Sequence, residues 1–302
     1  MTLSALWIDG LKNIIQRGLL NQLQQYHKAQ YQMNFVFNNK KVRVVFIIII
    51  LSFSSNSSTE SSSLDVYNLG VKFSLAVKWW GLSAQGDMEV IGKENVRGQD
   101  TVIVRSHVTE VKGFLSFIIK FLRMYRESNT FDSYINPTSA LPVRYEVYKI
   151  MQDGSKKPTE NVYFDRKNKR VASFDDDSTI VSNTPPDIQD TFSSFLMLIN
   201  RFNNEDLYVD KCITLNLYVY RESSKINVRV VGQKVVDGHK VYMMKIDRLP
   251  PIFKYPASIS FEVVELGDIK FPVRGQCIIE LPNFKDIVID GELSILSRGK
   301  KP

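Results

Sequence analysis

The strongest constraint on the fold is an alternation of apolar and polar residues that begins near Leu69 and continues almost to the end of the chain. The segment VKFSLAVKW, residues 71–79, is apolar at every second position, which puts these residues on one face of a β-strand. Similar runs follow, separated by turn sequences such as QDG and VDG. We therefore predict a mainly β domain of about ten strands, built as a curved antiparallel sheet or an open barrel.

Two segments interrupt the alternation and are predicted to be helices packed on the sheet. The first, near 113–124, has a stripe of apolar residues at helical spacing: Phe114, Phe117, Ile118 and Phe121. The second, near 190–202, begins with Asp190, a residue type favoured at the N-cap. Both segments fit helices of the core. Both also fit a lid over an apolar cavity, which curled sheets often enclose, and we adopt the lid as a hypothesis for the first.

The N-terminal part of the chain has the pattern of an export signal. In NNKKVRVVFIIIILSFSSNSSTESSS, basic residues precede an apolar run and small polar residues follow it. As a helix, the run Val44–Phe53 is about 15 Å long, half of a ~30 Å hydrocarbon core. We predict a signal peptide over residues 33–57, starting at Met33, and a serine-rich linker over 58–68. An uncleaved anchor and a core strand are the alternatives.

This assignment places the protein in the periplasm or cell envelope. Residues 1–32 are then a non-translated extension or an amphipathic helix, and residues 69–298 form a single β-rich domain. The net charge of +7 does not indicate nucleic-acid binding, because residues 1–54 contain six basic residues and one acidic residue. In an oxidising compartment Cys212 and Cys277 have the option of a disulfide, although a strand cysteine is more often a small buried apolar residue.

No catalytic motif stands out in the predicted domain. It contains two histidines, His107 and His239, and no G-x-S-x-G sequence of a serine hydrolase. The zinc motif H-E-x-x-H, the redox motif C-x-x-C and the Walker loop are also missing. Asp175–Asp177 lack the spacing of a calcium-binding loop. We expect a protein without enzyme activity, cofactor or metal.

Two groups of residues are candidates for ligand binding. Trp79 and Trp80 are adjacent, so in a strand one enters the core and the other faces outward, where it can stack on a sugar or lie at a membrane interface. An arginine–glutamate cluster inside the bowl of the sheet is the best polar candidate, and its alternative is structural pairing. This cluster consists of Arg126, Glu127, Arg144 and Glu146. The full set of candidate ligand-binding residues is Phe114, Phe117, Ile118, Phe121, Trp79, Arg126 and Arg144.

Five segments of the domain, taken in order, match the pattern of a known family. They are GVKFSLAVKWWGLSAQGDMEV, YRESNTFDSYINPTSALPVRYEV, VYFDRKNKRV, PDIQDTFSSFLMLINRF and KFPVRGQCIIELPNFKDIVIDGEL. They resemble the bacterial exported proteins grouped as domain of unknown function 3108, over residues 69–296. Gln85 and the segment SISFEVVELGD depart from the family pattern. The resemblance implies an envelope location and a curved antiparallel sheet with helices, and it implies no activity.

Three functions remain open from the sequence. The first is a non-enzymatic envelope protein that holds or carries an apolar ligand, such as a lipid, in a cavity of the sheet. The second is a scaffold or interaction module for cell-wall or outer-membrane assembly, which binds an envelope protein or a glycan. The third is a hydrolase that uses two carboxylates, and no pair of acids in the sequence is marked out for that role. The oligomeric state is left open.

Overall fold

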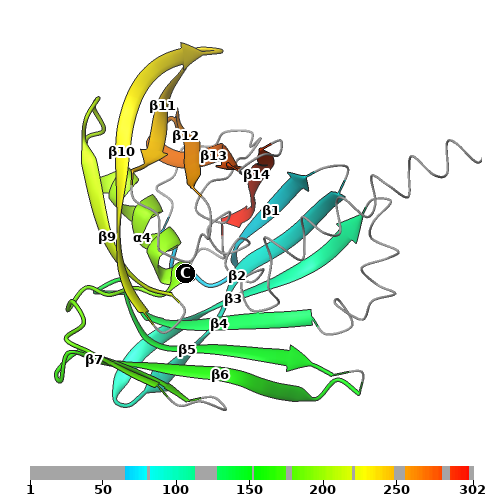
Figure 1. Cartoon of the computed structure of the whole chain (residues 1–302), viewed down its shortest axis with the longest axis vertical. Coiled ribbons are helices and arrows are strands. Elements are labelled where there is room, and N and C mark those ends of the chain that lie inside the picture. The colour runs from blue at the N-terminus through cyan, green and yellow to red at the C-terminus, as the bar shows by residue number, and fades with distance from the viewer. Residues whose placement is uncertain are drawn as a thin grey trace, which may run out of the picture. The chain divides into compact units, whose positions relative to one another are not determined.

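The protein is mainly β, as the alternation predicted. The computed structural model describes residues 65–79, 82–112, 128–151, 153–174, 179–219, 222–247, 256–280 and 286–298. Its strands are β1 Val71–Trp79, β2 Leu82–Val96, β3 Gln99–Lys112, β4 Ser128–Asn136, β5 Leu141–Ile150, β6 Lys156–Asp165, β7 Arg170–Phe174, β8 Thr179–Ser182, β9 Cys212–Val219, β10 Glu222–Val236, β11 His239–Ile246, β12 Ala257–Leu266, β13 Ile269–Ile279 and β14 Ile287–Arg298. They form one 14-stranded sheet (Figure 1), more strands than the ten or so expected.

The sheet is antiparallel and open. Its order is β8-β7-β6-β5-β4-β3-β2-β1-β14-β13-β12-β11-β10-β9, so the first and last strands of the domain are neighbours in its middle. The end strands β8 and β9 do not pair with each other. The prediction of a curved antiparallel sheet or an open barrel is therefore confirmed as an open antiparallel sheet, which hydrogen-bonded strands do not close into a barrel.

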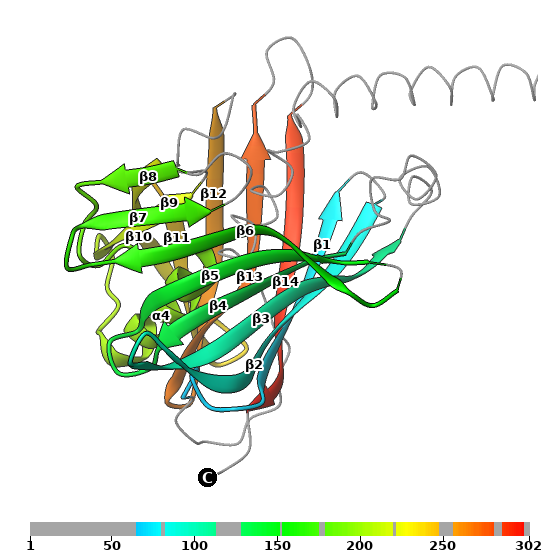
Figure 2. The same cartoon turned by 90° about the horizontal axis from the view of Figure 1, so that it is seen from below.

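Helix α4, Thr191–Asn204, packs on one face of this sheet. It begins where the sequence predicted, because the Asp190 carboxylate accepts hydrogen bonds from the backbone N–H groups of Phe192 and Ser193. The helix contacts β4, β9 and β13, which are far apart in the strand order, so the sheet curls around it (Figures 1 and 2). The other predicted helix, near 113–124, lies outside the described residues, within which α4 is the only helix.

Aromatic rings fill the space between α4 and the sheet. The Phe195 ring meets the Phe73 ring of β1 edge-on at 5.9 Å, and Phe73 stacks on Phe271 of β13 at 5.7 Å. The Phe192 ring lies 5.6 Å from Phe131 of β4. Nine residues of α4 are buried, so this helix belongs to the core. This agrees with the interpretation of the segment as a core helix and not as a lid. In the described part of the chain no helix is long and apolar enough to cross a membrane.

Two parts of the sheet repeat the same strand register. We call β1–β5 the first unit and β9–β13 the second unit. A residue at positive φ precedes the first strand of each unit. In the first unit the Gly70 N–H donates to the Val90 carbonyl at 2.8 Å, and in the second the Asp210 N–H donates to the Val230 carbonyl at 2.8 Å. In both, the second and third strands shift register at a bulge that spans Val90–Gly92 or Val230–Gly232.

The turns and the later strands of the two units also correspond. The β2–β3 turn has Arg97 and Gly98 at φ 53° and 81°, and the β10–β11 turn has Asp237 and Gly238 at φ 51° and 79°. These angles match a two-residue hairpin turn with both central residues left-handed. A further bulge lies directly after a proline in each unit, Pro142 in β5 and Pro272 in β13. We conclude that the two units are an internal structural repeat.

The gap between the end strands is bridged by residues 185–190. Gln189 makes an isolated parallel bridge with Leu217 of β9 through backbone hydrogen bonds of 2.7 Å. From the other end of the sheet, the Arg166 guanidinium donates to three backbone carbonyls, those of Pro142, Pro186 and Ile188. This segment therefore connects β9 to the β5–β7 end of the sheet without adding a strand.

The optional disulfide between Cys212 and Cys277 does not form. Cys212, on β9, and Cys277, on β13, are free thiols, the first exposed and the second buried. Four strand spacings separate β9 from β13, which corresponds to roughly 19 Å across the sheet. A disulfide requires Cα atoms within about 7 Å, so the pairing is excluded by the strand order.

Candidate functional site

The candidate site lies on the face of the first unit that points away from α4. Successive residues of β4 point to opposite faces. Ser133 faces the helix, because its hydroxyl donates to the Asp190 carboxylate at 2.6 Å, and Phe131 faces it through Phe192. Asp132 and Tyr134 therefore face the opposite side, which we call the polar face.

One row of the polar face runs across six strands in register. Each member pairs laterally with the next, from β1 to β6: Lys72, Glu89, Arg105, Asp132, Glu146 and Asn161. The neighbouring rows contain Asp87, His107, Thr130 and Tyr148 on one side, and Tyr134, Arg144 and Tyr163 on the other. Charged side chains that are distant in sequence are thereby placed about 5 Å apart.

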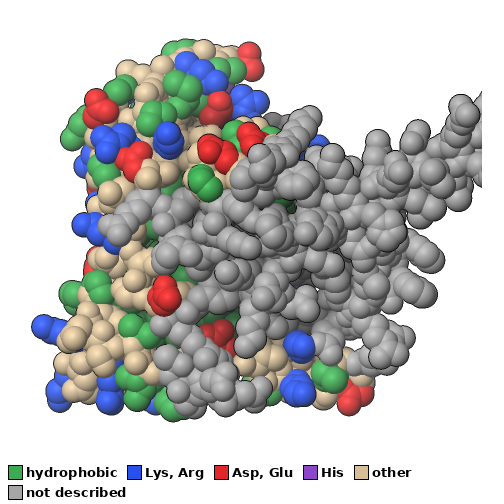
Figure 3. Space-filling model, viewed as in Figure 1, with side chains coloured by type: hydrophobic (Ala, Val, Ile, Leu, Met, Phe, Trp, Pro, Cys, Tyr) green, Lys and Arg blue, Asp and Glu red, His purple; other side chains and the backbone are tan. Residues whose placement is uncertain are grey.

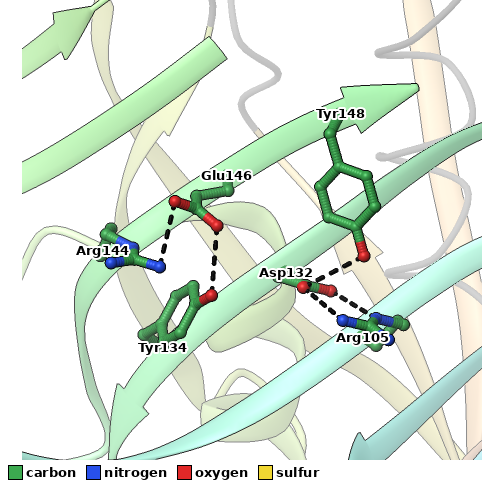
Figure 4. Close-up of polar contacts among 6 residues, drawn as sticks. All are labelled: Arg105, Asp132, Tyr134, Arg144, Glu146 and Tyr148. Carbon is green, nitrogen blue, oxygen red and sulfur yellow. Dashed lines mark hydrogen bonds and ion pairs between the residues drawn. The ribbon is translucent and has the colours of Figure 1, made fainter. Parts of the chain in front are cut away.

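Asp132 is the centre of the first group of contacts (Figure 4). Arg105 donates two hydrogen bonds to its carboxylate, from Nε at 2.8 Å and from Nη2 at 2.7 Å. Such a bidentate pair is among the stronger polar contacts of proteins. The Tyr148 hydroxyl donates to the same carboxylate at 3.2 Å, and the Lys156 ammonium lies 4.5 Å from the Tyr148 ring. Burial, together with the Asp132 charge, raises the pKa of Tyr148 above its usual value.

Glu146 is the centre of the second group. Arg144 Nη2 lies 3.0 Å from one carboxylate oxygen, and the Tyr134 hydroxyl donates to the other at 3.1 Å (Figure 4). The Arg144 guanidinium also covers the Tyr134 ring at 3.9 Å and lies 3.7 Å from Glu94 of β2. Burial, and then the Glu146 charge, raises the pKa of Tyr134 to about 12. Both tyrosines are thus neutral hydrogen-bond donors at physiological pH.

Four buried polar atoms of this face have no hydrogen-bond partner within the described residues. They are Asp87 Oδ1, His107 Nδ1, Arg144 Nε and Asn161 Oδ1. Asp87 and His107 are lateral partners on β2 and β3, and Arg144 and Asn161 lie on β5 and β6. A buried polar atom without a partner costs about 1–3 kcal/mol, so such atoms are normally satisfied by water or a ligand. The polar face has unsatisfied groups on both sides of its paired centre.

Comparison with known proteins assigns the family. A family profile described as "Protein of unknown function (DUF3108)" matches residues 72–277. The chain belongs to this family. The DUF3108 chain is also similar to a solved structure from Brucella abortus, described as a beta-barrel-like protein of domain of unknown function DUF1849. The TM-score is 0.44 at 10% identity, over 76% of this chain and 99% of the other. No curated protein matches the chain.

The structure of the DUF3108 domain brings only part of the predicted site together. Arg144 and Glu146 do pair, but on the face opposite α4, so their predicted position inside the bowl is wrong. Trp79 ends β1, and its side chain is outside the described part of the protein. The other candidates also fall outside the described residues: Phe114, Phe117, Ile118, Phe121 and Arg126, together with Trp80 and Glu127.

Sequence reasoning missed the residues that complete the DUF3108 polar face. Arg105 and Asp132 are 27 residues apart in the chain and meet only through the β3–β4 register. The sequence signal was an unusual one for a strand, namely ionisable residues alternating with apolar residues on β3, β4 and β5 alike. Among the described residues, no group of three or more histidine, cysteine, aspartate or glutamate side chains is arranged to hold a metal ion.

Proposed function

We propose that the protein is an exported, non-catalytic binding protein of the cell envelope that holds a neutral glycan chain on the polar face of its first unit. Export is supported by the basic, apolar and serine-rich order of residues 38–63. Glycan binding is supported by one observation above the others, the four buried and unpartnered polar atoms of the polar face.

The chemistry of these four atoms fits sugar hydroxyl groups. Asp87 Oδ1 and Asn161 Oδ1 are acceptors, Arg144 Nε carries a donor hydrogen, and His107 Nδ1 takes either role according to its tautomer. A hydroxyl group both donates and accepts, so a polyhydroxylated chain satisfies this mixture with one kind of group. The outer pairs lie on β2–β3 and β5–β6, about three strand spacings or roughly 14 Å apart, which calls for an extended ligand.

The charge of the face argues for a neutral rather than an anionic glycan. Its rows and the side chains that contact them contain five basic residues, Lys72, Arg97, Arg105, Arg144 and Lys156, and five acidic ones, Asp87, Glu89, Glu94, Asp132 and Glu146. A face with balanced charges does not attract an anionic ligand. The apolar-ligand hypothesis depends on residues 113–124, which lie outside the described part, so it remains a prediction with no support from the polar face.

Removing the unpartnered atoms tests the proposal, because ligand binding should then weaken while the stability of the protein stays nearly the same. We expect Asn161→Ala and His107→Ala to weaken binding of soluble cell-wall glycan fragments about tenfold each in calorimetric titrations, since each loses a hydrogen bond to the ligand. The free energy of unfolding should stay within about 1 kcal/mol of the wild-type value, because no protein–protein hydrogen bond is lost.

The strand that follows the second unit, β14, provides the matched control, because Asn161 lies on β6, the strand that follows the first unit. Asp290 of β14 pairs with Gln276 as Asn161 pairs with Glu146, so Asp290→Ala removes the corresponding side chain from a face that lacks the cluster. Its glycan affinity should equal that of the wild type. Absence of glycan binding by the wild type, or equal losses in Asn161→Ala and Asp290→Ala, would overturn the proposal.

A further inference from the structure

The ends of the two long hairpins, β2–β3 and β10–β11, differ although their backbones correspond. In the first, Val96 is 4% exposed and packs against Tyr134, Val143 and Ile103. In the second, Val236 at the same position is 40% exposed, and its neighbour Val235 is 72% exposed. Val231, at the bulge, is also exposed. The second hairpin therefore presents aliphatic side chains to the solvent that the first hairpin does not. Val96 is covered where Val236 is exposed, and the polar residue Asn95 occupies the position of Val235.

The end of the second hairpin is uncovered because the adjacent strand, β12, has a charged residue where the first unit has an aromatic one. Glu262 of β12 occupies the place of Tyr134 in the first unit. Its carboxylate accepts hydrogen bonds from Lys234 at 2.8 Å and Arg274 at 2.7 Å, so it offers charge where the first unit offers an aromatic ring. In the first unit Arg97 additionally covers the Tyr163 ring at 4.1 Å, and the corresponding turn residue is Asp237.

The orientation of the exposed valines limits what can cover them. Val235 and Val236 are consecutive in β10, so their side chains point to opposite faces of the hairpin. A flat protein surface covers one face of a hairpin end, whereas the interfacial layer of a lipid bilayer surrounds it on both. The end of β10 lies at the top of Figure 1, and Figure 3 shows hydrophobic, basic and acidic side chains interspersed there.

The two hairpins also differ in charge, and the second is the more basic one. Residues 222–247 contain five basic and three acidic side chains, whereas residues 82–112 contain four basic and five acidic ones. Lys234 and Lys240 flank the exposed valines. The opposing charges are Asp237 at the turn, Glu262, which pairs with Lys234, and Glu265, whose charge acts on Lys240. Each basic residue near an anionic membrane contributes about 1 kcal/mol to binding.

We propose that the end of the β10–β11 hairpin is a membrane-docking element, which inserts Val235 and Val236 into the interface of an anionic lipid bilayer. Lys240 contacts the lipid headgroups, and the aliphatic side chains lose their contact with water. The first unit has no such element, because its hairpin end packs on its own sheet. The inference is independent of the glycan proposal, since it concerns the other unit and a different surface.

A fluorophore that reports local polarity tests docking at the hairpin itself. In a full-length Cys212→Ser background, the probe is attached at Val235→Cys, or at Asn95→Cys as the matched position in the first hairpin. With vesicles that contain phosphatidylglycerol, the emission of the probe at 235 should shift to the blue, and that of the probe at 95 should not. Because the readout is local, membrane binding by residues 44–53 does not produce it.

Two further measurements distinguish the contribution of charge to membrane docking from that of apolar contact. Lys240→Gln in the Val235→Cys background should require about fivefold more anionic lipid for half of the shift. Vesicles of phosphatidylcholine alone should give a much smaller shift. The proposal is overturned by equal shifts at 95 and 235, by no shift at 235, or by a shift at 235 that grows with protein concentration without lipid, which indicates contact between two copies of the chain.

Discussion

The first and second units share strand register and bulges, yet they use the face opposite α4 differently. Arg144 and Arg274 follow the same proline at corresponding bulges, but the side chain of Arg144 is 17% exposed and that of Arg274 is 62% exposed. Around Arg144 the face gathers tyrosines and partly buried carboxylates. Around Arg274 it keeps a solvent-exposed ion pair. Backbone register is thus the repeated property, and side-chain burial is what distinguishes the two units.

This difference has an energetic meaning. Exposed ion pairs such as Arg274–Glu262 are screened by water and contribute roughly 0–1 kcal/mol. Buried groups such as Asp132 have lost solvation, so their partners become necessary. The first unit therefore depends on its polar contacts for stability, while the second can change its surface charges at little cost. Unpartnered atoms on the first unit are correspondingly informative about a ligand.

The largest expected effect concerns the two cysteines, which lie at opposite ends of the second unit. Cys212 is exposed on the edge strand β9, whereas Cys277 is buried and its pKa is raised by burial to about 12. A thiol-alkylating reagent at pH 8 should modify Cys277 at least about a thousandfold more slowly, because the reaction requires opening of the core. Peptide mass spectrometry at timed intervals measures both rates. Comparable rates for the two thiols would show that the β9–β13 core is not formed.

The next largest effect is a difference in stability between substitutions at corresponding positions of the two units, on the face opposite α4. Asp132→Ala should lower the free energy of unfolding by about 2–4 kcal/mol, because Arg105 and Tyr148 lose their common acceptor. Ser260, at the corresponding position of β12, is exposed, and Ser260→Ala should change stability by less than about 0.5 kcal/mol. Urea unfolding of both variants gives the difference. Equal effects would remove the distinction between the units.

Much of this architecture could be predicted from the sequence. The alternation of VKFSLAVKW and its successors predicted the mainly β, antiparallel fold, and Asp190 predicted the start of α4. The repeat was not recognised, although V-x-G at 90–92 and 230–232 and P-V-R at 142–144 and 272–274 mark it. Its period is not constant, because the connection after the third strand is longer in the first unit than in the second.

The position of the site was harder to predict than its residues. Arg144 and Glu146 were selected from the sequence, but they were assigned to the wrong face. A shift of one residue in a strand reverses every side chain, and the register here depends on bulges such as the one at Tyr134–Ile135. The Arg105–Asp132 pair depends on the same register across β3 and β4. These features are set by tertiary pairing, which local alternation does not specify.

The two faces of β4 differ in how stability should respond to pH. On the helix side, burial raises the pKa of Asp190, against the opposing hydrogen bonds from Ser133 and the helix N–H groups. A carboxyl whose pKa is raised by folding contributes stability that is fully present below its unfolded pKa of about 3.9 and is lost as pH rises through the folded value. Wild-type stability should therefore decline with rising pH more steeply than that of Asp190→Asn. Urea unfolding between pH 4 and pH 8 measures the two slopes, and parallel curves would contradict the raised pKa.

The smallest expected effect compares the two arginines directly. Arg144→Ala should lower the free energy of unfolding by about 1–2 kcal/mol, because Glu146 loses its ion pair and the Tyr134 ring loses its cationic neighbour. Arg274→Ala should cost less than about 0.5 kcal/mol, because the exposed pair that it breaks is screened and Lys234 still contacts Glu262. Repeating both measurements in 1 M salt sharpens the test, since the Debye length then falls to about 3 Å. The Arg274→Ala effect should vanish and most of the Arg144→Ala effect should persist. If salt removed both effects equally, the polar face of the first unit would be an ordinary solvated surface, and the unpartnered atoms on it would no longer indicate a ligand.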